Sequence, residues 1–226
     1  MLNLTSLLPD TGPLRLLCIG AHSDDLEIGC GGTLLAWLAS TRPVEITWVV
    51  ATASGERADE ARRSARQLLK RAARLDVVLG DFRDGFLPGQ YLEVKAFFES
   101  LKDERDPHVV LTHRLDDRHQ DHRLLGELTW NTWRNHLILE YEVAKYEGDL
   151  GLPNLFVQLS RSQAQRKASH LMKHFGSQRS KSWFDPETFL ALARLRGLEC
   201  RSPSGYAEAF HARKLVLSLG DKEQRS

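Results

Sequence analysis

The segment 14–32, LRLLCIGAHSDDLEIGCGG, joins an apolar run to a polar, glycine-rich turn. Its first part, residues 14–19, is apolar at nearly every position, which is typical of a buried parallel strand. A second such run, VEITWVV, follows at 44–50, and the residues 32–40 between them predict a helix. This order predicts a βαβ unit with a right-handed crossover.

The same alternation continues up to residue 136. Apolar residues recur at helical spacing over 59–74. The other predicted elements are strands at 75–79 and 108–112 and helices at 93–102 and 123–135. Four strand–helix repeats predict a mostly parallel sheet with helices on both faces, a Rossmann-like three-layer α/β sandwich. In the Rossmann-like strand order 3-2-1-4-5, the first and fourth strands are neighbours.

After residue 136 the sequence predicts additional C-terminal strands and helices. These are strands at 137–144, 155–159 and 207–219 and helices at 162–174 and 187–195. Ser162 and Gln165 suit a capping box for the first of these helices, and Asp185 with Pro186 suits the start of the second. Because no linker or low-complexity segment interrupts the chain, we expect residues 1–226 to form one domain.

The composition indicates an ordinary soluble protein with balanced charge. Of 226 residues, 42% are hydrophobic, and 31 Lys and Arg stand against 30 Asp and Glu, a formal net charge of +1. This balance disfavours nucleic acid or an anionic membrane as partner, since both attract a basic excess. Three cysteines suit no complete disulfide framework, and neither a signal peptide nor a membrane span is evident. We therefore expect a cytoplasmic protein.

Two polar clusters follow predicted strands one and four. His22, Asp24 and Asp25 come directly after the first strand, and HRLDDRHQDH, residues 113–122, follows the fourth. Either cluster alone could be a solvated loop with local Asx turns. The carboxyl ends of neighbouring parallel strands meet at one edge of a sheet, however, and ligands bind at that edge. We therefore expect the two clusters to converge.

The glycine-rich turn after the first strand could bind a dinucleotide or help to hold a metal ion. The G-x-G-x-x-G pattern of dinucleotide sites is absent, and Asp24 and Asp25 would repel a pyrophosphate. Three protein ligands with an open fourth position are the pattern of catalytic zinc. His22 and Asp25 could supply two of these ligands, with the third coming from 113–122. The sequence therefore favours a divalent metal site.

Both clusters resemble the signatures of a known family. GAHSDDLEIGCGG, residues 20–32, resembles the AHPDD-x-E-x-G-x-G-G signature of the PIG-L or LmbE-like zinc de-N-acetylases, and HRLDDRHQDH resembles their H-x-x-x-D-x-H-x-D-H signature. The resemblance continues through YEVAKYEGDLGLPN, FGSQRSKSWF, LRGLEC and YAEAF, so it covers nearly the whole chain. Ser23 stands where the family usually has proline, at a position that is not expected to bind metal.

The resemblance implies a zinc-dependent hydrolase. It places zinc, or another divalent transition metal, on His22, Asp25 and His122. The implied substrate is a small N-acetylated amino sugar conjugate, similar to N-acetylglucosamine, which is cleaved to acetate and a free amine. A thiol-conjugate amidase or another deacylase with the same site is the alternative, and a non-catalytic sugar-binding scaffold is a third reading. Relatives commonly assemble, so a homo-oligomer is possible.

The resemblance also implies roles for residues around the metal. Asp24 would be the general base that takes a proton from the attacking water and delivers it to the leaving amine. His119, held by Asp121 as an imidazolium, would stabilise the oxyanion. Arg57 and Asp84 match positions at which relatives contact polar groups of the substrate.

Three further residues have open interpretations at this stage. His113 is either a hydrogen-bonded loop histidine or a neighbour of the metal ligands. Asp117 is expected to support the loop or one of its histidines. Trp183, in a polar loop, either packs structurally, stacks on a sugar ring or closes a subunit contact.

Overall fold

The computed structural model describes residues 12–104 and 106–216. Within these ranges, seven strands form one mixed sheet in the order β3-β2-β1-β4-β5-β7-β6. The strands are β1 (Leu14–Gly20), β2 (Val44–Val50), β3 (Arg74–Leu79), β4 (Val109–His113), β5 (Leu137–Tyr141), β6 (Leu155–Leu159) and β7 (Tyr206–His211). The first five are parallel, and β7 is antiparallel to both of its neighbours. The predicted order 3-2-1-4-5 is confirmed, so β1 and β4 are adjacent.

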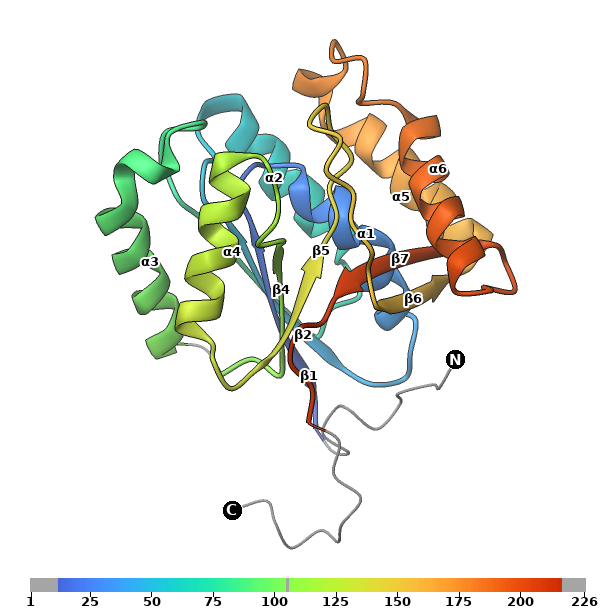
Figure 1. The fold of residues 1–226 in the computed structure, drawn as a ribbon, viewed down its shortest axis with the longest axis horizontal. Helices are drawn as coiled ribbons and strands as arrows, with labels where there is room; N and C mark the ends of the chain where they lie inside the picture. Colours follow the sequence, from blue (N-terminus) through green and yellow to red (C-terminus); the bar gives the residue numbers. More distant parts are fainter. Residues whose placement is uncertain (1–11, 105, 217–226) are drawn as a thin grey trace, which may run out of the picture.

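Helices cover both faces of the sheet and complete the three-layer sandwich (Figure 1). They are α1 (Asp25–Trp37), α2 (Gly55–Leu68), α3 (Tyr91–Glu104), α4 (Gln120–Thr132), α5 (Arg161–His174) and α6 (Pro186–Glu199), with short 3-10 helices η1 (Leu87–Gln90) and η2 (Gly176–Gln178). Leu16 and Cys18 of β1 lie in the core beneath α1, α2 and α5, whereas Leu17 and Ile19 lie in the core beneath α3 and α4. Because successive side chains of β1 point to opposite faces of the sheet, this one strand contributes to both hydrophobic cores.

The start of helix α1 differs most from the prediction. We expected a glycine-rich turn and a helix from residue 32, but the helix begins at Asp25 and includes the glycines. A Cβ atom at Gly29 would come within 2.1 Å of the Tyr141 ring, and one at Gly32 within 2.5 Å of Leu159. These glycines therefore permit close packing rather than a turn. Helix α2 likewise spans Gly55–Leu68 rather than 59–74.

The C-terminal elements have the predicted types and order, with shifted boundaries. The capping box of α5 consists of Ser160 and Gln163, two residues before the predicted pair. Asp185 caps α6 and Pro186 is its first residue, as predicted. The predicted strand 207–219 ends at His211, and residues 217–219 lie outside the described ranges. Of the helices described, none has the length and apolarity that a membrane span requires.

Candidate metal centre and active site

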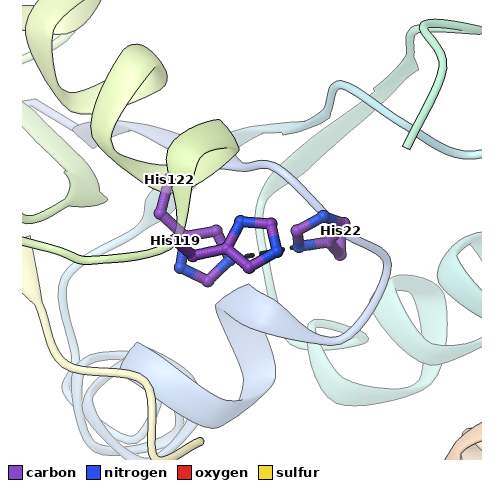
Figure 2. Close-up of side chains that lie close together, drawn as sticks. All are labelled: His22, His119 and His122. Carbon is purple, nitrogen blue, oxygen red and sulfur yellow. Dashed lines mark hydrogen bonds between the residues drawn. The ribbon is translucent and has the colours of Figure 1, made fainter. Parts of the chain in front are cut away.

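The candidate site lies where the segments after β1 and β4 meet. His22 lies between β1 and α1, and Asp25 is the first residue of α1. His119 caps the N-terminus of α4, and His122 lies in its first turn. Figure 2 shows the rings of His119 and His122 extending from the start of α4 toward the ring of His22. The two polar clusters of the sequence therefore converge, as expected.

Three donor atoms, from His22, Asp25 and His122, form a nearly equilateral triangle. Nδ1 of His22 lies 3.1 Å from Nε2 of His122 and 3.2 Å from Oδ2 of Asp25, and the last two atoms are 3.4 Å apart. A tetrahedral zinc ion with ligands at about 2.0–2.1 Å places neighbouring ligands about 3.3–3.4 Å apart. All three side chains are buried. The donor triangle therefore fits a small divalent ion.

The electrostatics of the triangle also favour a cation. Burial acts to raise the pKa of Asp25, but the charges of His122, His22 and His113 outweigh it and hold that pKa well below its ordinary value. The pKa values of His22 and His122 are raised, because attraction to Asp25 and hydrogen bonds to carboxylates exceed the opposing effect of burial. Protons and a metal ion thus compete for the same nitrogen atoms, so metal binding would release protons.

Carboxylates behind the histidines fix which nitrogen of each ring faces the triangle. Nδ1 of His122 lies 3.1 Å from Oδ2 of Asp117. On the other ring, Nε2 of His22 lies 3.1 Å from Oδ1 of Asp84 and 3.5 Å from Oδ2 of Asp121. Such carboxylates orient metal-ligating histidines and raise their basicity. Asp117 therefore lies where the sequence predicted a support, and Asp84 contacts a ligand of the triangle.

Asp24 lies beside the triangle rather than in it. Its Oδ1 is 3.4 Å from Nη2 of Arg57, whose Nη1 forms a 2.6 Å hydrogen bond with Oδ2 of Asp84. Burial, together with the charge of neighbouring Asp25, raises the pKa of Asp24. A carboxylate with a raised pKa at the edge of a candidate metal site is suited to accept and return a proton.

The expected pairing of Asp121 with His119 is wrong in its geometry. The carboxylate of Asp121 accepts hydrogen bonds from the backbone N–H groups of Gly85 at 2.7 Å and Leu87 at 3.1 Å, so it holds the loop before η1. Only the backbone N–H of Asp121 contacts His119, donating to Nδ1 at 3.3 Å. Burial, and then the charges of the two neighbouring imidazoles, lower the pKa of His119. Because Nδ1 of His119 accepts this bond, the ring has Nε2–H as its remaining donor, and the expected imidazolium held by the carboxylate of Asp121 is not found.

A cleft of about 280 Å³ opens onto these groups. Its lining includes His22, Asp24, Asp25, Arg57, Asp84, His119 and His122 from the first part of the chain and Lys145, Tyr146, Lys181 and Trp183 from the second. All of the residues selected from the sequence except Asp117, Asp121 and His113 thus border one cavity, and Asp117 contacts His122 from behind. Asp121 and His113 lie behind it, in contact with its ligands.

Two residues have a larger part in the site than the sequence indicated. His113 is fully buried, stacks on His122 with ring centroids 3.9 Å apart, and places Nε2 3.1 Å from Oδ2 of Asp25. Lys145, to which we assigned no role, places Nζ 3.2 Å from the carboxylate of Asp117. Two further sets, one with His119 beside His22 and His122 and one with His113 beside Asp25 and His122, also place one donor atom from each residue within 4.8 Å of the others. Extra nitrogen atoms therefore surround the triangle.

The fold and the donor set together define an α/β protein with a candidate metal site at the carboxyl edge of its sheet. A family model described as PIG-L, GlcNAc-PI de-N-acetylase, matches residues 17–133, which is just over half of the chain. The chain belongs to the PIG-L family. No match was found among curated proteins.

Several solved structures are similar. The chain is 22% identical to the N,N'-diacetylchitobiose deacetylase of Pyrococcus horikoshii, with a TM-score of 0.65 over 87% of this chain and 82% of that one. It is 16% identical to the teicoplanin deacetylase Orf2 in a zinc-inhibited form, with a TM-score of 0.66 over 87% and 96%. It is 17% identical to the 4-carboxy-2-hydroxymuconate hydratase GalB of Pseudomonas putida KT2440, with a TM-score of 0.71 over 92% and 99%. At these identities the likeness shows a shared fold, which supports more than one chemistry.

Proposed function

We propose that this protein is a zinc-dependent deacetylase that removes the acetyl group from a small N-acetylated amino sugar conjugate, similar to N-acetylglucosamine. The observation that carries the proposal is the donor triangle of His22, Asp25 and His122 with the free carboxylate of Asp24 beside it. Family membership supports an acetamide as the bond that is cleaved, and the chitobiose and teicoplanin deacetylases support a sugar conjugate as substrate. We further propose a cytoplasmic enzyme formed by one domain, residues 1–226.

The chemistry follows from the residues around the triangle. A divalent ion held by the triangle would act as a Lewis acid that polarises the acetamide carbonyl and lowers the pKa of water. Asp24 takes the proton of the attacking water and returns it to the amine nitrogen as the C–N bond breaks. His119 donates its Nε2–H to the carbonyl oxygen as negative charge develops there. Loss of one such donor typically lowers kcat by about 10²–10³-fold.

Arg57 and Asp84 are suited to bind the polar rim of the substrate. They pair with each other at 2.6 Å, and the side chain of Asp84 is half exposed in the cleft. The guanidinium offers donors and the carboxylate offers acceptors, so together they can bind adjacent hydroxyl groups of a sugar. Asp121 acts indirectly, because it fixes the backbone of the loop that carries Asp84.

The deciding measurement is acetate release from a panel of acetamido sugars and thiol conjugates, with chelator and with zinc restored. We expect Asp24→Asn to lower kcat/KM by about 10²-fold or more, in the range of a lost general acid–base group, while bound metal stays at the wild-type level. Asp25→Asn, its matched neighbour, should instead lose the metal. A purified protein that binds no divalent ion, or an Asp24→Asn variant with unchanged turnover, would falsify the proposal.

The similarity to GalB makes a hydratase the competing outcome. Hydration adds water across a carbon–carbon double bond and releases no acetate, so product analysis on the same samples separates the two reactions. Within the hydrolase class, conjugates that differ in acyl length and in the group attached to the sugar separate an acetamido sugar deacetylase from a thiol-conjugate amidase or another deacylase.

A further inference from the structure

An aromatic wall formed by Tyr146 and Trp183 lines the cleft that contains Asp24 and His119. Tyr146 comes from the loop between β5 and β6, and Trp183 from the segment between η2 and α6. Their rings meet edge to face with centroids 6.5 Å apart, and the hydroxyl groups of Tyr146 and Ser182 lie 3.0 Å apart. Figure 1 shows these two segments extending side by side beyond the same end of the molecule.

The aromatic wall is anchored in the core but left open to the cleft. Trp183 packs edge to face on Phe184, with centroids 5.6 Å apart. Phe184 is buried and packs in turn on Phe175 and Phe189. By contrast, Tyr146 is 69% exposed, and Trp183 is only partly buried. A fixed aromatic surface that stays open beside a few polar groups is typical of a small-molecule site.

We infer that the aromatic wall is a specificity subsite that stacks on the pyranose ring of the substrate. A pyranose chair exposes C–H bonds on its faces and hydroxyl groups around its rim. One face can therefore pack on the indole of Trp183 while the rim binds Arg57 and Asp84. The cleft volume of about 280 Å³ is close to the lower end of small-molecule pockets, about 300 Å³, so it suits a single sugar unit.

This inference rests on the proposed function, because the acetamide must lie at Asp24 for the ring to reach Trp183. Its consequence is selectivity. Acyclic acetamides, such as acetylated amines, offer the same bond to Asp24 and His119 but have no ring face to stack. The wall therefore distinguishes acetamido sugars from other acetamides, although it has no part in bond cleavage.

The kinetic test compares Trp183→Ala and Trp183→Phe on methyl N-acetyl-β-glucosaminide and on N-acetylethanolamine. For the sugar, we expect the alanine variant to raise KM about tenfold with little change in kcat, and the phenylalanine variant to stay within about threefold, because it keeps an aromatic face. Turnover of the acyclic acetamide should be unchanged in both variants. Equal losses on both substrates, or no loss on the sugar, would overturn the inference.

A binding measurement separates this inference from the proposed function. In the Asp24→Asn background the sugar is not consumed, so its binding can be followed by tryptophan fluorescence. The sugar-dependent change should disappear in Trp183→Phe and persist in Trp37→Phe, a matched variant at the end of α1, outside the cleft. A signal that survives Trp183→Phe would refute the subsite. A sugar-dependent signal that comes from Trp183, without any acetate release by the wild type, would refute the deacetylase and retain the subsite.

Discussion

Lys145 links the loop after β5 to the donor triangle through hydrogen-bonded ion pairs. Its ammonium lies 2.7 Å from both oxygens of Asp149 and 3.2 Å from the carboxylate of Asp117, and Asp117 in turn contacts Nδ1 of His122. Asp149 also accepts a hydrogen bond from the backbone N–H of Arg118 at 2.7 Å. Burial acts to raise the pKa of Asp117, but the hydrogen bond to His122 and the charges of the neighbouring imidazoles and of Lys145 together lower it. Lys145 therefore helps to hold the Asp117 carboxylate behind His122, without touching the donor triangle itself.

Replacing Lys145 with methionine, which keeps most of the length of the side chain and removes its charge, should weaken metal binding. We expect zinc affinity to fall about tenfold, at the lower end of the effect of losing a group that supports a metal ligand. Calorimetric titration with zinc would measure this. Lys181→Met is the matched control, because Lys181 lines the same cleft but lies over the ring of Trp183 rather than beside Asp117. Equal affinities for wild type and Lys145→Met would contradict this role.

Single residues show where prediction from the sequence succeeds and where it stops. The sequence alone could indicate that His22 and Asp25 meet the histidine-rich stretch, because their strands are neighbours. It could not decide which of Asp24 and Asp25 faces the triangle, since that depends on how the first turn of α1 is oriented. The partners of Asp121 and Lys145 were equally hidden: Gly85 and Leu87 lie more than 30 positions from Asp121.

Among the elements, helix α1 determines how precisely the site is held. Asp25 is its first residue, and the helix is buried along nearly its whole length. At Gly29 it rests on the ring of Tyr141, whose hydroxyl donates a 2.7 Å hydrogen bond to the carbonyl of Ile19. The sequence signal was ambiguous here, because three glycines so close together in a helix resemble a turn until their packing partners are known.

Gly29→Ala should therefore displace α1 from β5. We expect it to lower the free energy of unfolding by about 1–3 kcal/mol, as overpacking of a core does, and to weaken zinc binding as well. Gly31→Ala is the matched control, because a Cβ atom there meets its nearest neighbour at 3.7 Å, an ordinary contact. It should be tolerated, since alanine favours a helix more than glycine does. Urea denaturation would measure the free energy of unfolding of both variants. Equal stability of Gly29→Ala and Gly31→Ala would show that the packing of Gly29 on Tyr141 is unimportant.

For the whole molecule, the arrangement of β1 to β5 was predictable, whereas the places of the two C-terminal strands in the sheet were not. Parallel strands with crossover helices allow few orders, so the pattern of apolar runs indicated the order 3-2-1-4-5 directly. Antiparallel β7, inserted between β5 and β6, follows from no such rule, because its register depends on contacts across the sheet. For the same reason, the sequence left the role of Trp183 open, and its contact with Tyr146 and the part played by Lys145 emerged only with the structure.

The stability of the whole molecule should depend on pH through its buried histidines. Burial, reinforced by the charge of His174, lowers the pKa of His170 to about 4, and Nε2 of His170 lies 2.8 Å from Oγ of Ser64. In the unfolded chain, His170 takes up a proton near pH 6.5. The stabilisation of the folded state by neutral His170 is therefore complete above that pH and is lost as the pH falls toward about 4.

We expect the free energy of unfolding of the wild type to fall between pH 6.5 and 4.5, by about 1–2 kcal/mol more than that of His170→Gln. Glutamine keeps an N–H donor for Ser64 but does not titrate in this range. Urea denaturation at several pH values would measure the difference. If the free energies of unfolding of the wild type and of His170→Gln change equally with pH across this range, His170 is not the source of the pH dependence.

Helix α1 is held in part by residues outside the segment that matches the family model. Residues 17–133 contain the whole donor triangle and both candidate proton-handling groups. Yet the backbone N–H groups of Gly32 and Thr33 donate to the carboxylate of Glu208 at 2.9 and 2.6 Å, and Glu208 pairs with Lys167. A fragment of residues 17–133 would keep the signature motifs but would lack Glu208 and Lys167, and with them the hydrogen bonds to the backbone of α1. The segment that identifies the family thus depends on the C-terminal part of the chain, through Glu208, for the contacts that hold the backbone of α1.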